Sequence, residues 1–369
     1  MSYIDIMRHK SHNKPVSGID NILIYYFSGT GNSAAVSVWA EQVAAKTGIR
    51  CQLNNIALID RKNIQKPPPG SLLGFISPTH GFNYPPIMIH FLFRFPVSKG
   101  NKVFFMNTRA GMKLWKIYLM GLSGMALYFS SVLFLLKGYR IAGMRPVDLP
   151  STWISIHPGI REKVYKSIIL RRKKQCQKFF SKLFSGKRDF RGIWSLPVDL
   201  FITPISVLYY IIGRFGLAKT YFASSKCTNC GLCESSCPVL AIKTIDSRRY
   251  WTYKCESCMK CMNQCPERAI ETPHGFFALI IFIGSSVILA SLNQAVHYHS
   301  FLKEHLPDRI GGFIAFAVDN LVLILTIFLG YRIMHFLLRY KLFEKIIVYT
   351  SLTKFRFWRR YRPRWKEYV

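Results

Sequence analysis

Residues 227–266 read CTNCGLCESSCPVLAIKTIDSRRYWTYKCESCMKCMNQCP. This stretch contains the pattern C-x-x-C-x-x-C-x-x-x-C-P twice, and a short segment with the composition of a strand, residues 250–253, lies between the two copies. The copies consist of Cys227, Cys230, Cys233, Cys237 and Pro238, and of Cys255, Cys258, Cys261, Cys265 and Pro266. Two such runs have the ligand spacing of a pair of [4Fe-4S] clusters.

The spacing follows from the shape of a cubane cluster. Three thiolates on one tight loop reach three irons, and the fourth thiolate comes from the other copy of the motif. The sequence therefore predicts two ligand sets, Cys227, Cys230, Cys233 and Cys265 for one cluster and Cys255, Cys258, Cys261 and Cys237 for the other. In this respect the stretch resembles bacterial ferredoxins with two clusters. The proline after each copy turns the chain away from the ligand loop, because it fixes φ and lacks an N–H donor.

Zinc and disulfide bonds are the alternative uses of these cysteines. A structural zinc site takes two C-x-x-C pairs around one tetrahedron, so two runs of four cysteines suit it poorly. Disulfides need an oxidising compartment, and nothing in the upstream sequence indicates one. The dipeptide Ala-Ile recurs at 241–242 and 269–270, at matching offsets after the two runs, and indicates an internal duplication.

The charge of the chain is unusual for a soluble electron carrier. Its 369 residues, enough for two or three domains, carry 51 Lys and Arg against 18 Asp and Glu, and half of them are hydrophobic. Residues 227–275 are near neutral at +1, whereas residues 1–150 and 151–226 carry +12 each and residues 276–369 carry +8. Such a surface fits nucleic acid or an anionic membrane, and apolar runs near the C-terminus favour the membrane.

The redox compartment is predicted from the remaining cysteines and the N-terminus. Cys51 and Cys176 are scattered singles, which we expect to be small buried hydrophobes in a reducing cytoplasm. The N-terminal residues are basic and lack the apolar core of a signal peptide, so we expect residues 1–275 to stay in the cytoplasm.

A second motif lies near the N-terminus. Residues 21–27 form an apolar run rich in Ile and Tyr, and a helical pattern spans residues 34–46 and stops at Gly48. The loop between them consists of Ser28, Gly29, Thr30, Gly31, Asn32 and Ser33. A strand, a loop of small residues and a helix present backbone N–H groups and a helix N-terminus to a phosphate.

The composition of this loop argues against two common kinds of phosphate ligand. It lacks the lysine of nucleoside triphosphate loops and the three glycines of dinucleotide loops. It resembles the phosphate loop of the flavodoxin family, [ST]-x-T-G-x-[ST]. The resemblance implies an FMN phosphate in contact with Ser28, Thr30, Asn32 and Ser33.

Two later loops support the resemblance. Strand patterns at residues 71–76 and 103–106 lead into loops at 77–86 and 107–111, and ligands of such folds lie beyond the carboxyl ends of the strands. In the flavodoxin family these loops hold the isoalloxazine ring, which implies contacts from Pro78, Thr79, His80, Gly81, Phe82, Tyr84, Asn107, Thr108 and Gly111. Phe82 or Tyr84 would flank the ring and Gly81 would supply the peptide at flavin N5, while ordinary loop packing is the alternative for both aromatic residues.

Two apolar stretches of this half are not expected to cross a membrane. We predict one helix over residues 114–136, followed by the last strand at 139–147, because a crossing there would separate that strand from its sheet. Residues 161–191 carry twelve Lys and Arg and fit the final helix of the domain, with a basic face on anionic lipid. Residues 193–222 contain two prolines and two glycines and are predicted to be packed or interfacial.

A transmembrane hairpin is predicted at residues 276–296 and 310–331, which are long enough to span the hydrocarbon core. Asp319 interrupts the second run, and Asn293 and Gln294 are its expected partners, with a proton or quinone site as the alternative. The tail from residue 339 carries ten Lys and Arg interleaved with Trp358, Tyr361 and Trp365, so both ends of the hairpin are predicted to be cytoplasmic.

The first 275 residues resemble fused proteins of anaerobic bacteria and archaea that join a flavodoxin to a two-cluster ferredoxin, and residues 144–153 and 221–224 share that resemblance. The implied fold class is an α/β flavodoxin-like doubly wound parallel sheet, a small α+β two-cluster ferredoxin domain and two transmembrane helices. The predicted parts are an N-terminal tail at 1–20, an FMN domain at 21–158, a basic and apolar helical connector at 159–222, the ferredoxin domain at 223–274, the hairpin at 275–338 and a basic cytoplasmic tail at 339–369.

The expected function is a membrane-anchored relay of electrons between FMN and the two [4Fe-4S] clusters, with redox proteins and membrane lipid as partners and no nucleic acid. No paired carboxylates and no catalytic triad stand out in the sequence. One alternative is an FMN-dependent reductase of a quinone or small substrate, with His80 as proton donor. Another is an iron–sulfur sensor or assembly module whose flavin site is empty.

Overall fold

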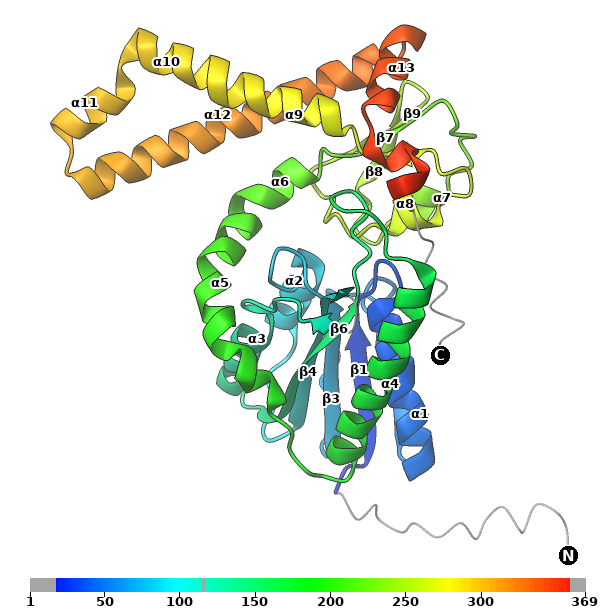
Figure 1. Ribbon diagram of the computed structural model, residues 1–369. Helices are drawn as coiled ribbons and strands as arrows, with labels where there is room; N and C mark the ends of the chain where they lie inside the picture. Colours follow the sequence, from blue (N-terminus) through cyan, green and yellow to red (C-terminus); the bar gives the residue numbers. More distant parts are fainter. Residues whose placement is uncertain (1–17, 115–116, 359–369) are drawn as a thin grey trace, which may run out of the picture.

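The computed structural model describes residues 18–114 and 117–358. Figure 1 shows three parts: an α/β unit, a small domain that carries the cysteine motifs, and long helices that project from the small domain. The small domain lies beyond the end of the sheet toward which β1 points. The two predicted cofactor motifs therefore belong to different domains, which meet at the carboxyl ends of the strands.

The α/β unit is built on five parallel strands in the order β2-β1-β3-β4-β6. Their bounds are β1 Asn21–Tyr26, β2 Arg50–Asn55, β3 Ser71–Pro78, β4 Lys102–Leu114 and β6 Arg140–Pro150. This is the strand order of the flavodoxin-like doubly wound fold, as the sequence predicted. In that fold the order reverses beside β1, where a crevice forms at the carboxyl ends of the strands.

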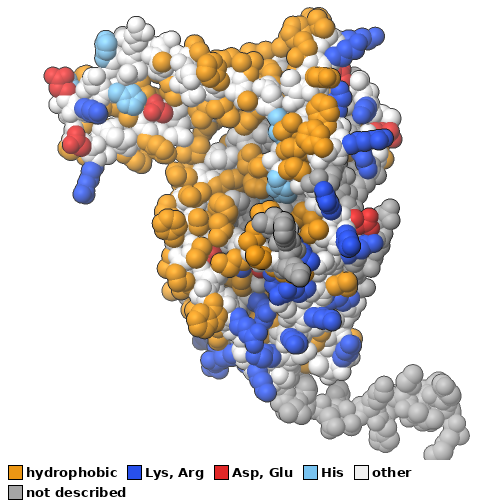
Figure 2. Space-filling model, in the orientation of Figure 1, with side chains coloured by type: hydrophobic (Ala, Val, Ile, Leu, Met, Phe, Trp, Pro, Cys, Tyr) orange, Lys and Arg blue, Asp and Glu red, His pale blue; other side chains and the backbone are white. Residues whose placement is uncertain are grey.

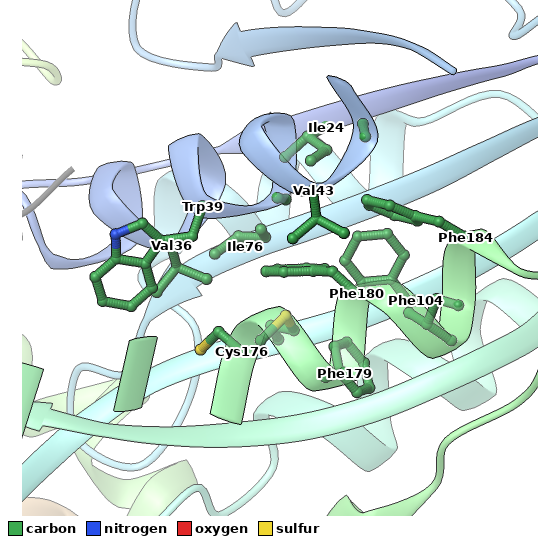
Figure 3. Close-up of a cluster of buried hydrophobic side chains, with 14 of the residues drawn as sticks. Ile24, Val36, Trp39, Val43, Ile76, Phe104, Cys176, Phe179, Phe180 and Phe184 are labelled. Carbon is green, nitrogen blue, oxygen red and sulfur yellow. The ribbon is translucent and has the colours of Figure 1, made fainter. Parts of the chain in front are cut away.

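Helices cover both faces of this sheet. Their bounds are α1 Asn32–Thr47 and α4 Glu162–Phe184 on one face, and α2 Pro86–Arg94 and α3 Ala126–Leu136 on the other. Figure 3 shows Trp39 and Val43 of α1, Phe180 of α4 and Phe104 of β4 in one cluster of buried side chains. The rings of Phe104 and Phe180 lie 6.0 Å apart at a steep angle, which is a favourable arrangement for an aromatic pair.

The basic helix α4 therefore belongs to the α/β unit, as its packing role predicted. The unit extends past residue 158, where the sequence had placed its end, because Phe179, Phe180 and Phe184 complete its core. The strand β2 had no sequence signal. It is an edge strand with the polar sequence RCQLNN, so it lacks an apolar run.

The predicted single helix over residues 114–136 is wrong. The strand β4 continues to Leu114, and a short strand β5, Ile117–Leu119, pairs with it in antiparallel fashion, so α3 begins only at Ala126. Between β5 and α3, Gly124 adopts a φ of 51°, which breaks the helical conformation. Residues 107–111, predicted as a loop, also lie within β4 because β6 pairs with them along their whole length.

A buried ionic network fixes the ends of β4 and β6. Asp148 accepts a hydrogen bond from Arg109 Nε at 2.6 Å and another from Arg172 Nη2 at 3.0 Å. The backbone N–H of Gly121 also donates to Asp148, at 2.9 Å. One carboxylate thus joins β4, the segment after β5 and helix α4.

The small domain surrounds its own core. Its elements are β7 Phe222–Ala223, α7 Leu232–Ser235, β8 Ile242–Ile245, β9 Arg248–Trp251, α8 Lys260–Gln264 and β10 Ile270–Glu271. The strand β7 pairs with β10 and β8 pairs with β9, both antiparallel. Trp251 and Tyr221 are fully buried and pack with the cysteine-bearing loops.

Within the described residues, three helices are long and apolar enough to cross a membrane, Arg191–Leu217, His274–Gln294 and Asp308–Leu337. The first is continuous through η1 Arg191–Ser195, α5 Leu196–Leu208, η2 Tyr209–Gly213 and α6 Arg214–Leu217. The others comprise α9 His274–Phe282, η3 Ile283–Ile288 and α10 Leu289–Val296, then α11 Tyr298–His305 as a connection and α12 Asp308–Leu337. Figure 2 shows hydrophobic side chains gathered over α5 and the projecting helices.

The helix Arg191–Leu217 is bound to the α/β unit along its length. The backbone N–H groups of Ser123 and Gly124 donate to the buried carboxylate of Asp199, at 3.1 and 2.9 Å. Further along, Ser206 donates to the carbonyl of Phe82 at 3.0 Å. Its other face stays exposed and apolar. These contacts agree with the predicted packed segment, although its length also makes it a candidate span.

Asp319 has different partners from those predicted. Its carboxylate accepts a hydrogen bond from the hydroxyl of Tyr298 and lies 3.5 Å from His299 Nε2, both on α11. Asn293 instead accepts a hydrogen bond from the backbone N–H of His299. The partners differ because the chain turns back at His297 and brings α11 beside α12.

The C-terminal segment packs on the small domain. It forms α13 Lys341–Tyr349, η4 Leu352–Lys354 and η5 Arg356–Trp358, and the predicted aromatic residues Tyr361 and Trp365 lie outside the described residues. Glu344 pairs with Arg248 at 2.8 Å, and the Trp358 indole donates to the carbonyl of Ile154 at 2.6 Å. Both ends of the long helical pair therefore lie at the small domain.

The ionic network at Asp148 leads to a stability prediction. Replacing Asp148 with Ala leaves two buried guanidinium groups without their carboxylate, which costs about 3–5 kcal/mol. We expect the thermal unfolding midpoint of the α/β unit to fall by about 10 °C. Glu162→Ala is the control, because its ion pair with Lys166 is exposed and contributes about 0.5 kcal/mol or less. Equal midpoints for the two variants would contradict the prediction.

Candidate functional site

A cavity of about 330 Å³ lies at the carboxyl ends of β1, β3, β4 and β6. Most residues of the predicted flavin site line it, namely Ser28, Gly29, Thr30, Asn32, Ser33, Pro78, Thr79, His80, Gly81, Phe82 and Thr108. They come from three segments that are distant in the sequence: the segment after β1, the end of β3 with the loop that follows it, and Thr108 within β4. The sheet topology therefore brings the predicted phosphate loop and the 77–86 loop to one place.

The predicted phosphate loop leaves the start of α1 available to a ligand. Gly31 caps the helix with a φ of 108° and no side chain bonds to the first turn, so its leading N–H groups lack intrahelical partners. The loop is held by its own hydroxyls: Ser28 Oγ accepts from the Gly31 N–H at 3.0 Å, and Thr30 Oγ1 lies 2.7 Å from Thr152 Oγ1. A helix N-terminus edged by hydroxyls suits a phosphate.

The predicted site residues that do not line the cavity are Gly31, Tyr84, Asn107 and Gly111. The assignment of Tyr84 as a ring-flanking residue is wrong. Its ring is buried in the core beneath α2, and its hydroxyl donates to the carbonyl of Met106 at 3.0 Å. Asn107 is likewise fully buried in β4, while Gly111 packs against Asp148.

The turn at Gly81 and Phe82 is held in a special conformation. Both residues have positive φ, 55° and 64°. The carbonyl of Phe82 accepts hydrogen bonds from the Met125 N–H and from Ser206 Oγ, each at 3.0 Å. A Cβ atom at position 81 would lie 2.0 Å from the ring of Tyr209, so only glycine fits there. The helix Arg191–Leu217 thus closes one wall of the cavity.

His80 lines the cavity as predicted, but its chemistry differs from that of a proton donor. Burial lowers the pKa of His80 to about 4. The imidazole is therefore neutral near pH 7, where an imidazolium acid is absent. This weighs against the reductase alternative that relied on it.

Several residues of the cavity were not found from the sequence. They are Pro150, Ser151, Thr152, Trp153 and His157 after β6, Arg109, Ala110 and Leu122 near β4, Ile205 and Tyr209 of the apolar helix, and Ser257, Cys258 and Met259 of the small domain. The first group follows the last strand of the sheet, so the rule that ligands lie at carboxyl ends of strands was a usable signal. The residues of the apolar helix and of the small domain line the cavity only because those parts of the chain pack against the α/β unit.

The eight motif cysteines surround two further cavities. One is lined by Cys227, Cys230, Cys233 and Cys265, and the other is lined by Cys237, Cys255, Cys258 and Cys261. These are the two sets that the sequence predicted, with one cysteine exchanged between the runs. In the described part of the chain, no three His, Cys, Asp or Glu side chains are grouped to hold a single metal ion.

The two remaining cysteines differ in their surroundings. Cys176 is buried in the core between α4 and the sheet, and burial raises the pKa of its thiol to about 12. Burial also raises the pKa of Cys51 to about 12. Both thiols are therefore protonated near pH 7. Cys176 is the buried packing residue that the sequence predicts, whereas Cys51 is only half-buried.

The loop cavity and the second cysteine cavity share a wall. Cys258 lines both of them. A Cβ atom on Gly29 would lie 2.2 Å from the carbonyl oxygen of Cys258, so the backbones of the two loops are in contact. Trp153 lines the loop cavity and also packs on the core of the small domain.

A buried lysine lies behind the second cysteine set. The Lys219 side chain donates to the carbonyl of Trp251 at 2.5 Å, and its ammonium lies 4.3–4.7 Å from the ring centroids of Tyr250, Tyr253 and Tyr331. Burial lowers the pKa of Lys219 to about 8, and the nearby Cys255 acts in the opposite direction. A buried ammonium without a carboxylate partner in the described structure is stabilised by these rings.

Residues 226–270 match the family model for a 4Fe-4S dicluster domain. The match covers the small domain and implies [4Fe-4S] clusters there. A search of curated proteins returned no match.

The α/β unit is similar to several solved structures. A flavodoxin from the domain Archaea is 11% identical, with 44% of this chain and 98% of that chain covered and a TM-score of 0.25. General stress protein 14 from Treponema denticola, in complex with FMN, is 14% identical, with 44% and 99% covered and a TM-score of 0.26. Rubredoxin oxygen:oxidoreductase from Desulfovibrio gigas is 10% identical, with 45% and 36% covered and a TM-score of 0.26. This chain thus covers about a third of the last protein, and the fold assignment rests on the strand order.

Lys219 leads to a prediction about the clusters. A positive charge beside a cluster favours its reduced form, so Lys219→Met should lower a cluster midpoint potential on the order of 50 mV, the size of a partly screened charge interaction. In the wild type the potential should also fall as pH rises through about 8, because the ammonium loses its proton there. In the Met variant that step should be absent.

An anaerobic redox titration followed by electron paramagnetic resonance measures both effects. Lys243→Met is the matched control, since this lysine belongs to the same domain but is exposed on β8. A potential that is unchanged by Lys219→Met, with iron content preserved, would contradict the prediction.

Proposed function

We propose that the chain is a membrane-anchored electron-transfer protein that carries electrons between FMN and two [4Fe-4S] clusters, to or from redox protein partners. One observation carries the proposal. The cavity at the carboxyl edge of the sheet is lined both by the phosphate-type loop and by Cys258 of the cluster domain. Sites for the two kinds of cofactor are therefore in contact within one chain.

The residues around the loop cavity fit FMN. The open first turn of α1, with Ser28, Thr30 and Asn32, would hold the phosphate. Phe82 and Trp153, two of the aromatic residues that line the cavity, would contact the ring. When bound, FMN exchanges two electrons in single steps and the clusters exchange one each.

The cysteine sets give the order of the centres. The set that contains Cys258 would hold the cluster next to the flavin. The other set would hold a cluster nearer the surface, because Cys230 is exposed to solvent. Leu232, also exposed, lies in the lining of that set and offers an apolar contact to a redox partner. The protein's part is to hold the centres at fixed separations.

The membrane part of the proposal concerns the helices His274–Gln294 and Asp308–Leu337. Both are apolar, both are largely exposed in the structure, and both begin or end at the cluster domain. They would form a hairpin that crosses the membrane twice, with the redox domains and the packed C-terminal segment on the cytoplasmic side.

The third apolar helix, Arg191–Leu217, would lie along the membrane surface. Asp199 and Ser206 bind its inner face to the α/β unit, while Trp194 and Phe201 are 88% and 81% exposed on its outer face. A crossing by this helix would carry the attached loops of the α/β unit into the bilayer. Large aromatic residues beside a basic surface suit the membrane interface.

Cofactor analysis tests the parts of the proposal. Anaerobic purification in detergent should yield one FMN with about eight irons and eight sulfides per chain. Clusters without flavin would overturn the relay and favour a sensor or assembly role.

The contact between Gly29 and Cys258 gives a kinetic prediction. Gly29→Ala places a methyl group against the Cys258 carbonyl and forces the two loops apart. The rate of electron transfer between flavin and clusters, measured by transient absorbance after flash reduction, should fall several-fold. The iron content of the protein should stay the same. Gly312→Ala is the control, since a Cβ there meets nothing within 4 Å. Unchanged kinetics in the Gly29 variant would place the transfer route elsewhere.

A further inference from the structure

A separate cavity of about 370 Å³ lies between α2, α6 and the start of the second cysteine run. It shares none of the residues of the loop cavity. Its charged or titratable lining residues are Arg61, His90, Arg94, Arg214, Lys254 and Glu256. Its apolar walls include Phe91, Phe215 and Tyr253. We call it the basic cavity.

The basic cavity has an excess of positive charge. Four cations, Arg61, Arg94, Arg214 and Lys254, face one carboxylate, Glu256. Among the described residues, no ion pair engages any of these four cations. A walled cavity with such an excess concentrates anions.

Two buried polar atoms of the lining lack hydrogen-bond partners in the described structure. They are Nε of Arg214 and Oε2 of Glu256. Buried polar groups in native proteins nearly always have a partner, so Arg214 Nε calls for an acceptor such as a phosphate oxygen, and Glu256 Oε2 calls for a donor such as water. The guanidinium of Arg214 is also oriented, because it lies 4.6 Å from the ring centroids of both Tyr210 and Phe215. A fixed, unpaired guanidinium is a ready donor to phosphate.

We propose that the basic cavity binds a phosphate-bearing anion. Phosphate oxygens would accept hydrogen bonds from Arg61, Arg94 and Arg214, and an apolar part of the ligand would pack on Phe215 and Tyr253. Either an anionic phospholipid headgroup or a free phosphate compound supplies this chemistry. The lipid source is close at hand, since Arg214 stands near the end of the apolar helix Arg191–Leu217.

The position of the cavity gives the bound anion a consequence for electron transfer. Cys255 lines the basic cavity as well as the second cysteine cavity. Negative charge beside a cluster disfavours its reduced form, so occupancy should shift that cluster to a more negative potential. By linkage, reduction should weaken the binding of the anion. This consequence rests on the proposed function, whereas the binding itself does not.

Binding to the full-length protein in detergent tests the site. The probes are inorganic phosphate, measured by calorimetry, and mixed micelles that contain phosphatidylglycerol or, for comparison, phosphatidylcholine. The wild type should bind phosphate, phosphatidylglycerol or both, and should not bind phosphatidylcholine. Arg94→Gln and Arg214→Gln should each weaken binding about tenfold, because each removes a hydrogen bond to a charged group. Arg140→Gln, an exposed arginine at the start of β6, is the control and should leave affinity unchanged.

The two probes separate the sources of the ligand. Binding of phosphatidylglycerol alone assigns the cavity to lipid, and binding of inorganic phosphate assigns it to free phosphate compounds. Failure of the wild type to bind either probe would overturn the proposal, whatever the variants do. Equal affinities for wild type and both variants would overturn it as well.

Cofactor content and potential distinguish this proposal from the relay. Anion binding to protein that lacks flavin would support the basic cavity while removing the relay. If the anion binds but the cluster potentials do not shift, the link to Cys255 is wrong and the binding site remains. Iron content measured on each variant confirms that the cluster domain is intact.

Discussion

The contact between the backbones of Gly29 and Cys258 is the constraint on which the rest of the structure depends. It needs a residue without a side chain in the phosphate-type loop, because the backbone of the cysteine-bearing loop leaves no room for a Cβ atom there. Met259 and Ser257, beside Cys258, both have positive φ, a conformation that residues other than glycine seldom adopt. Backbone sterics thus set how closely the two motifs approach each other.

The segment after β6 holds the two domains in that position. Thr152 bonds to Thr30 of the phosphate-type loop, while the carbonyl of Ile154 accepts from the indole of Trp358 near the C-terminus. The ring of His274, which begins the first projecting helix, lies 2.8 Å from the carbonyl of Ser155. Three distant parts of the chain therefore meet within a few residues, beside Thr152 and Trp153 of the cavity.

Local patterns in the sequence predicted the parts that depend on short-range geometry. The cysteine sets follow from cluster geometry, and the strand order follows from alternating strands and helices. The errors concern side chains whose direction depends on tertiary packing. Tyr84 lies in a predicted loop but its ring enters the core, and Asp319 meets Tyr298 only because α11 folds back. The apolar helix and the cysteine loop also line the cavity, and no pattern in the sequence predicted this, because both lie outside the α/β unit.

The projecting helices are joined to the cluster domain by more than a linker. Tyr331 of α12 donates to the carbonyl of Tyr221 at 3.0 Å and accepts from the N–H of Trp251 at 3.1 Å. Its ring also contacts the ammonium of Lys219. Because Trp251 packs among the cysteine loops, a rotation of α12 would shift the strand that lies behind the second cysteine set. Through Tyr331, α12 is thus bound directly to the part of the cluster domain that lies behind the second cysteine set.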